Sequence, residues 1–163
     1  MSSTAYIALG SNLDDPSAQI HRALAALAHL PQTELTDCAP WYRSAAVGPG
    51  TQADYINTVV RLHTELAPLD LLHALQAIET AQGRIRTQYW GARTLDLDIL
   101  LYDDLSLNTA ELTLPHPRLT ERNFVLMPLH DLAPELLLTN GKAIERSVKQ
   151  WLANCGSTGI VQL

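Results

Sequence analysis

The clearest hydrophobic pattern in the chain is a period of two, which predicts β-strands. Over residues 95–102 this period gives one apolar face, made of Leu95, Leu97, Ile99 and Leu101. Asp96 and Asp98 fall on the opposite face, so both carboxylates point the same way. Residues 55–64 have the same period, and it places Tyr55 and Asn57 together on one face.

A period near 3.6 residues predicts helices elsewhere. A short apolar strand at residues 6–9 closes in a turn at Gly10–Ser11–Asn12, and a helix follows that Asp14 and Asp15 can cap. Pro31 ends that helix. Pro68 opens a second helix that ends at Gly83, and residues 143–152 predict a third.

Residues 33–42 and 160–163 complete the predicted strands. The resulting order β-α-β-β-α-β predicts an α+β fold with a ferredoxin-like βαββαβ core. We expect a mostly antiparallel sheet flanked by helices, in three αβα layers. Residues 1–163 are expected to form one domain, since 47% of the 163 residues are hydrophobic, which is enough for a single core.

Charge and composition exclude several classes of protein. A formal net charge of −6 disfavours nucleic acid as a partner, because polyanion binding needs basic residues. We expect no membrane span and no signal peptide, and therefore a cytoplasmic protein. We also expect a monomer, with subunits paired through an apolar patch as the alternative. Cys38 and Cys155 lack the spacing of a zinc or redox site, so we expect unpaired thiols.

Asp96 and Asp98 are the strongest candidates for chemistry. Two carboxylates about 6–7 Å apart on one strand face repel each other by about 2–3 kcal/mol at an effective dielectric of 20. A solvated polar face remains the alternative. However, the preceding Trp90–Gly91–Ala92–Arg93–Thr94 adds a ring and a fixed cation, and carboxylate oxygens suit Mg²⁺ with substrate phosphates. The pair therefore indicates a phosphoryl-transfer site, with Arg84, Arg86 and Arg122 available to neutralise charge.

Other sites of chemistry have weaker support. The chain has no Gly-x-x-x-x-Gly-Lys-Ser/Thr loop and no Gly-x-Gly-x-x-Gly fingerprint, so side chains and metal would have to hold a nucleotide. His116 lies between Pro115 and Pro117, where the stiff backbone fixes its direction. A structural histidine is the default, and a hydrogen bond to phosphate is the functional alternative.

Four segments in order resemble the 6-hydroxymethyl-7,8-dihydropterin pyrophosphokinase family over nearly the whole chain. They are residues 6–12 (YIALGSN), 55–57 (YIN), 90–100 (WGARTLDLDIL) and 114–118 (LPHPR) continuing through 122–128 (RNFVLMP). The resemblance implies an enzyme of folate biosynthesis that transfers the β,γ-diphosphate of ATP to the hydroxymethyl group of the pterin and releases AMP.

The same resemblance implies roles for individual residues. Two Mg²⁺ ions would bind Asp96 and Asp98, with Arg84 and Arg93 beside the reacting phosphates as further catalytic residues. ATP would contact Gln76, Glu79, Arg84, Arg93, Ile99, His116 and Arg122. The pterin would contact Ser44, Ala46, Tyr55, Asn57, Trp90 and Phe124.

Two rival functions stay open at this point. A two-metal hydrolase would release phosphate without an acceptor, whereas a small-molecule sensor would bind its ligand without needing the aspartates. Residues 45–54 and 84–92 are expected to close over the substrates and exclude water.

Overall fold

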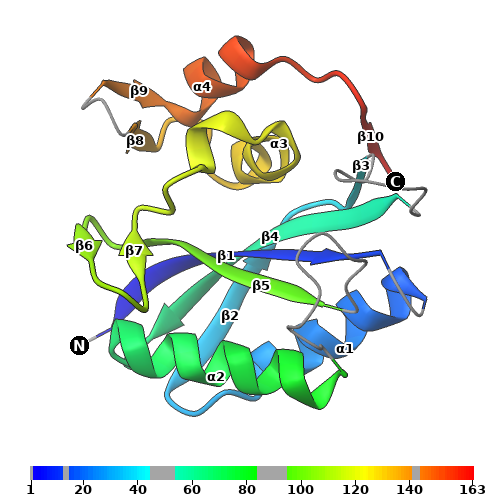
Figure 1. Ribbon diagram of the computed structural model, residues 1–163, viewed down its shortest axis with the longest axis vertical. Coiled ribbons are helices and arrows are strands. Elements are labelled where there is room, and N and C mark those ends of the chain that lie inside the picture. The colour runs from blue at the N-terminus through cyan, green and yellow to red at the C-terminus, as the bar shows by residue number, and fades with distance from the viewer. Residues whose placement is uncertain (1, 13–14, 45–53, 84–94, 141–143) are drawn as a thin grey trace.

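A six-stranded sheet forms the centre of the protein (Figure 1). The computed structural model describes residues 2–12, 15–44, 54–83, 95–140 and 144–163. The strands of the sheet are β1 (Ser3–Ser11), β2 (Thr33–Cys38), β3 (Tyr42–Ser44), β4 (Tyr55–Thr64), β5 (Asp96–Tyr102) and β10 (Ile160–Gln162). Their order is β10-β3-β4-β1-β5, β2 also pairs with β4, and every pair is antiparallel. The predicted mostly antiparallel sheet is confirmed.

Helices cover both faces of this sheet, as the three-layer prediction requires (Figure 1). On one face α1 (Pro16–Ala28) and α2 (Pro68–Ala81) pack over one buried apolar cluster. On the other face α3 (Asn123–Leu132) and α4 (Val148–Cys155) pack over a second cluster. The α+β class is therefore confirmed. None of the helices among the described residues is long and apolar enough to cross a membrane.

The connections follow the ferredoxin-like pattern predicted from the element order. Helix α1 connects β1 to β2, and β4 lies between those two strands. Helix α2 connects β4 to β5, and β1 lies between them. This interleaving places β1 at the centre, where both of its edges are paired. Residues on β1 therefore have neighbours from β4 and from β5.

Two predicted elements differ from those observed because proline or a cap sets their ends. The expected strand 33–42 divides into β2 and β3, with Pro40 between them, since proline has no N–H for the ladder. The helix expected at 143–152 begins only at Val148. Ser147 caps it, accepting a hydrogen bond from Gln150 N at 3.2 Å and donating its own N–H to Gln150 Oε1 at 2.9 Å. Residue 143 lies outside the described ranges.

The apolar face predicted for residues 95–102 is correct only as far as Ile99. The register between β1 and β5 shifts so that Tyr6 lies opposite Leu101 and Ile7 opposite Ile99, which leaves Leu100 as an extra residue. Such a bulge reverses the alternation of side chains. Leu100 and Leu101 consequently enter the cluster under α3 and α4, while Tyr102 joins the cluster under α1 and α2.

Several short elements and one longer helix were not predicted from the sequence. They are β6 (Leu107–Asn108), β7 (Thr113–Leu114), a 3₁₀ turn (Leu119–Glu121), β8 (Leu137–Thr139), β9 (Glu145–Ser147) and the helix α3. Strands β6 and β7 form one hairpin, and β8 and β9 form another. Pro128 lies inside α3, which obscures the helical signal because proline normally ends a helix.

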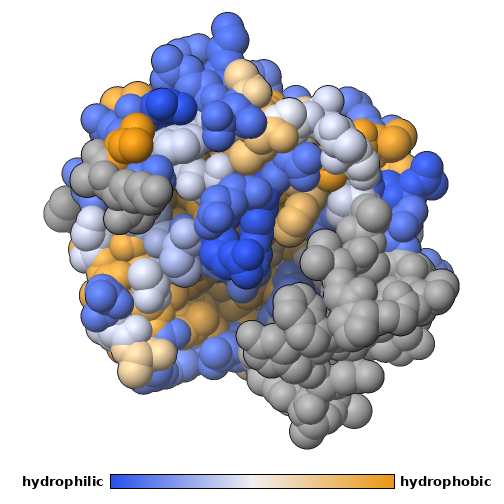
Figure 2. Space-filling model, turned by 45° about the horizontal axis from the view of Figure 1, so that its top comes forward, coloured by the Kyte–Doolittle hydropathy of each residue, from blue (hydrophilic) through white to orange (hydrophobic). Residues whose placement is uncertain are grey.

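The surface mixes polar and apolar residues. Figure 2 shows hydrophilic side chains interspersed with apolar ones on the face turned toward the viewer. Among the described residues, the large apolar side chains that remain exposed are Leu69, Leu105, Leu137, Ile144, Val161 and Leu163. Cys38 and Cys155 are unpaired thiols, as predicted.

Candidate active site

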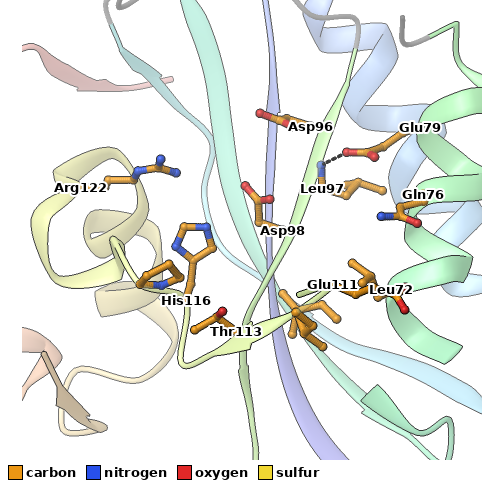
Figure 3. Close-up of a pocket in the computed structure, with 13 residues that line it drawn as sticks. Leu72, Gln76, Glu79, Asp96, Leu97, Asp98, Glu111, Thr113, His116 and Arg122 are labelled. Carbon is orange, nitrogen blue, oxygen red and sulfur yellow. Dashed lines mark hydrogen bonds between the residues drawn. The ribbon is translucent and has the colours of Figure 1, made fainter. Parts of the chain in front are cut away.

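Asp96 and Asp98 stand at the centre of the site. Both are half-buried on β5, while the residues between and after them are buried, so the predicted common face is confirmed. Asp98 lies opposite Ala8, a residue of the cluster under α3 and α4, and Asp96 lies opposite Gly10. Figure 3 shows the two carboxylates between the α2 side chains and those that precede α3.

A pocket of about 400 Å³ opens around this pair. Helix α2 and strand β5 form one wall, and the β6–β7 hairpin and the segment before α3 form the other. The lining residues are Leu72, Gln76, Glu79, Asp96, Leu97, Asp98, Ile99, Glu111, Leu112, Thr113, His116, Pro117 and Arg122. The structure thus brings both predicted metal ligands together with all the predicted ATP residues it describes. Arg84 and Arg93 lie outside the described residues.

Glu79 joins α2 to the strand that bears the aspartates. Its side chain is only 2% exposed, and Oε2 accepts the backbone N–H of Leu97 at 2.8 Å (Figure 3). Leu97 lies between Asp96 and Asp98, so this hydrogen bond fixes the strand at the acid pair. A buried N–H without an acceptor costs about 1–3 kcal/mol. Glu79 therefore positions the metal strand as well as lining the pocket.

His116 presents one nitrogen to the pocket and uses the other internally. Its backbone N–H donates to Leu100 O at 2.9 Å, and its Nδ1 accepts the backbone N–H of Arg118 at 3.2 Å. Burial, aided by the nearby Arg122 and Arg118 charges, lowers the pKa of His116 to about 4 although Asp96 opposes the shift. The neutral ring therefore carries its proton on Nε2, which suits donation to an anionic oxygen.

The low pKa of His116 predicts a specific pH response. An unfolded histidine takes up a proton near pH 6.5, whereas the folded protein does so near pH 4. Between these values the unfolded state binds more protons, so stability falls as pH falls. We expect a nuclear magnetic resonance titration of the ligand-free protein to give a His116 midpoint near 4. A midpoint near 6.5 would contradict the neutral-donor assignment.

Arg122 supplies a cation on the same side of the pocket as His116 (Figure 3). Its guanidinium carbon lies 5.8 Å from the centre of the Phe124 ring, within the range of a cation–π contact. This contact links a predicted ATP residue to a predicted pterin residue. The forked guanidinium matches the geometry of phosphate oxygens.

The predicted pterin residues form a separate group beside the pocket. Asn57 is 7% exposed and donates from Nδ2 to Ser44 Oγ at 2.7 Å, and Tyr55 lies two residues away on the same strand. None of these residues, nor Phe124, lines the pocket described above. Ala46 and Trp90 lie outside the described residues, as do most of the two expected closing loops.

Gly10 connects the two groups and was missed in the sequence. It lies opposite Asn57 on β4 and opposite Asp96 on β5, so the three residues form one row across the sheet. At about 4.8 Å per strand, Asn57 and Asp96 are separated by about 10 Å. A Cβ at Gly10 would stand 3.0 Å from Asn57 Oδ1. Strand β1 continues through Ser11, so the prediction that a turn begins at Gly10 is wrong. A glycine inside a strand often marks a place where another group lies close to the backbone, and this signal could have identified Gly10.

The site has the ligands that magnesium prefers. Asp96 and Asp98 offer hard carboxylate oxygens, and Mg²⁺ commonly uses only one or two of these together with substrate phosphates and water. Within the described ranges no group of three or more histidine, cysteine or acidic side chains forms a denser metal cluster. The donor set therefore fits a metal shared with a phosphate substrate.

Known proteins resemble this chain in sequence and in fold. The family model for 7,8-dihydro-6-hydroxymethylpterin-pyrophosphokinase matches residues 6–134. A 2-amino-4-hydroxy-6-hydroxymethyldihydropteridine pyrophosphokinase from Haemophilus influenzae is 49% identical over 148 residues, covering 91% of this chain and 92% of the relative. The enzyme of the same name from Pseudomonas aeruginosa is 50% identical over 158 residues, covering 97% and 95%.

Solved structures show the same fold at low sequence identity. Wild-type Plasmodium falciparum HPPK-DHPS with pterin and p-hydroxybenzoate superposes with a TM-score of 0.71 at 13% identity. The match covers 94% of this chain and 43% of that longer chain. Together with the fold and the acid-centred pocket, the sequence matches establish that the chain belongs to the 7,8-dihydro-6-hydroxymethylpterin-pyrophosphokinase family.

Proposed function

We propose that the chain transfers the β,γ-diphosphate of ATP to the hydroxymethyl group of 6-hydroxymethyl-7,8-dihydropterin, in the biosynthesis of tetrahydrofolate. Membership of the family confirms the predicted enzyme class, a pyrophosphokinase. The observation that supports the full reaction is the pocket itself, where Asp96 and Asp98 meet His116, Arg122 and Gln76. The products are AMP and the pterin diphosphate.

The reaction needs positioning and charge neutralisation more than covalent catalysis. The hydroxymethyl oxygen forms a bond to the β-phosphorus, the bond from that phosphorus to the α,β-bridging oxygen breaks, and the alcohol proton passes to solvent. Asp96 and Asp98 would hold two Mg²⁺ ions, which when bound neutralise the phosphates and align them. His116 would donate from Nε2 to a phosphate oxygen, and Arg122 would balance negative charge.

The pterin would lie over the row that crosses Gly10. Asn57 has an amide that can read the polar edge of the heterocycle, and Ser44 holds this amide in place. The absent side chain at Gly10 leaves room for a flat ring to approach the strand backbone. The hydroxymethyl group would then point along the row toward Asp96, about 10 Å from Asn57. The pterin ring is proposed to be enclosed by Tyr55, Phe124, Ala46 and Trp90. The reacting phosphates are proposed to contact Arg84 and Arg93.

The reaction is tested by identifying its products. Purified protein is mixed with ATP, Mg²⁺ and 6-hydroxymethyl-7,8-dihydropterin, and the products are identified by mass spectrometry. We expect AMP and a pterin diphosphate in equal amounts. Phosphate released without the pterin would favour the hydrolase, whereas binding without turnover would favour the sensor.

We further propose that residues 1–163 act as one domain in the cytoplasm and as a monomer. The exposed large apolar side chains of the described residues come mostly from different elements, which supports the monomer, since stable homodimers usually bury a continuous apolar patch. Light scattering at working concentration would measure the mass directly, and a value twice 17.9 kDa would contradict this part of the proposal.

A further inference from the structure

A bridge between His73 and Glu111 spans the rim of the pocket. His73 Nε2 lies 3.0 Å from Glu111 Oε2, so the ring donates to the carboxylate. The bridge joins α2 to the β6–β7 hairpin, and both side chains are more than half exposed. None of the roles proposed above requires a carboxylate at this position, although Glu111 lines the pocket.

The position of Glu111 restricts the part of a nucleotide that it can face. Figure 3 shows Glu111 beside Leu72, away from Asp96 and from the His116 side of the pocket. A carboxylate repels phosphate, so the polyphosphate belongs at the other end, where metal and Arg122 can balance its charge. The apolar lining at Leu97 and Ile99 suits a flat base. The ribose joins this base to the phosphates and carries no charge, so its hydroxyls are the donors that can face Glu111.

Carboxylates recognise ribose well because they only accept hydrogen bonds and have two oxygens for two hydroxyl donors. An acidic residue performs this task in dinucleotide-binding folds. His73 holds Oε2, and in the part of the chain that the structure describes it is the one hydrogen-bond partner of the Glu111 side chain. Oε1 and the remaining lone pair of Oε2 can therefore accept from a ligand.

We propose that Glu111, oriented by His73, accepts hydrogen bonds from the 2′- and 3′-hydroxyls of the nucleotide and selects ribonucleotides over deoxyribonucleotides. The inference deepens the proposed function and rests on ATP as the diphosphate donor. Glu111 is a binding residue in this account, and His73 is a positioning residue that acts through it.

The test compares ATP with 2′-deoxyATP. We expect the parent protein to show a KM about tenfold lower for ATP, the size of one charge-assisted hydrogen bond in a partly exposed site. Glu111→Ala should reduce this ratio to below about threefold, with Glu111→Gln between the two. Glu135→Gln, an exposed acid far along the chain, is the matched control and should keep the parent ratio.

His73 is tested by a pair of variants. His73→Leu removes the donor and should lower the ATP preference, whereas His73→Gln retains an N–H donor and should restore it. A merely structural role would change melting temperature without changing the ratio between the two nucleotides, so both quantities are measured.

The outcomes separate this inference from the proposed reaction. If the parent makes AMP and pterin diphosphate but the ATP preference is absent, or survives Glu111→Ala, the ribose assignment is wrong and the reaction stands. If the parent makes no AMP, the reaction is wrong. Calorimetry with α,β-methylene-ATP and its 2′-deoxy form then tests the ribose assignment on binding alone.

Discussion

Replacing Asp96 or Asp98 with asparagine is expected to lower kcat by about 10²–10³-fold, the usual cost of removing one preorganised charge from a polar transition state. Asparagine keeps the shape of the side chain and removes its negative charge. Because both carboxylates line the pocket on one face of β5, neither can substitute for the other in holding a metal. The measurement is the rate of AMP formation at saturating ATP and pterin over a range of Mg²⁺ concentrations.

The magnesium dependence identifies the cause of the loss. A lost ligand should raise the Mg²⁺ concentration needed for half-maximal rate, in addition to lowering kcat. Asp104→Asn is the matched control, because Asp104 is exposed in the turn that follows β5 and lies outside the pocket lining. Variants at residues 96 and 98 with rates within threefold of the control would remove the aspartates from the mechanism. A lower kcat at an unchanged Mg²⁺ requirement would contradict their role as metal ligands.

The sequence was most informative where one physical pattern dominated. The period of two in β4 and in the first part of β5 was sufficient to place Tyr55 with Asn57 and Asp96 with Asp98. The same rule failed after Ile99, because a bulge is a property of the pairing between two strands and leaves no local mark in either one.

Elements that depend on tertiary packing were the hardest to predict. The β6–β7 hairpin has two residues in each strand, too few for a period to show. Yet this hairpin brings Glu111 and Thr113 to the pocket. Helix α3 contains Pro128 and is stabilised by burial of residues such as Leu126 and Leu129 against the sheet, which no local propensity reports.

The candidate site likewise contains residues that the sequence could identify and residues that it could not. Asp96 and Asp98 could be recognised from their shared face and their basic, aromatic surroundings, whereas the assignments of Gln76, Ile99 and Phe124 came only from family resemblance. Gly10 required the strand register, since its importance lies in two neighbours on different strands. The sequence was sufficient to identify the two aspartates, whereas their distance from the predicted pterin residues follows only from the strand register.

Gly10→Ala is the second large effect that we expect, and it should act on the pterin alone. The new methyl group would stand 3.0 Å from Asn57 Oδ1 and 3.7 Å from Tyr55 Cδ1. Asn57 would have to move, and its hydrogen bond to Ser44 would lengthen or break. Misplacing one buried amide costs about 1–3 kcal/mol, so pterin affinity should fall about 10–100-fold.

A double-mutant cycle shows whether Gly10 acts through Asn57. Calorimetry would measure pterin binding to Gly10→Ala, Asn57→Ala and the double variant, with the affinity for an ATP analogue as the internal control. If the methyl group acts by displacing Asn57, it should cost little once that side chain is gone, so the two effects should not add. Additive losses would mean that the methyl group blocks the ring itself. Unchanged pterin affinity in Gly10→Ala would place the pterin elsewhere than over the row from Asn57 to Asp96.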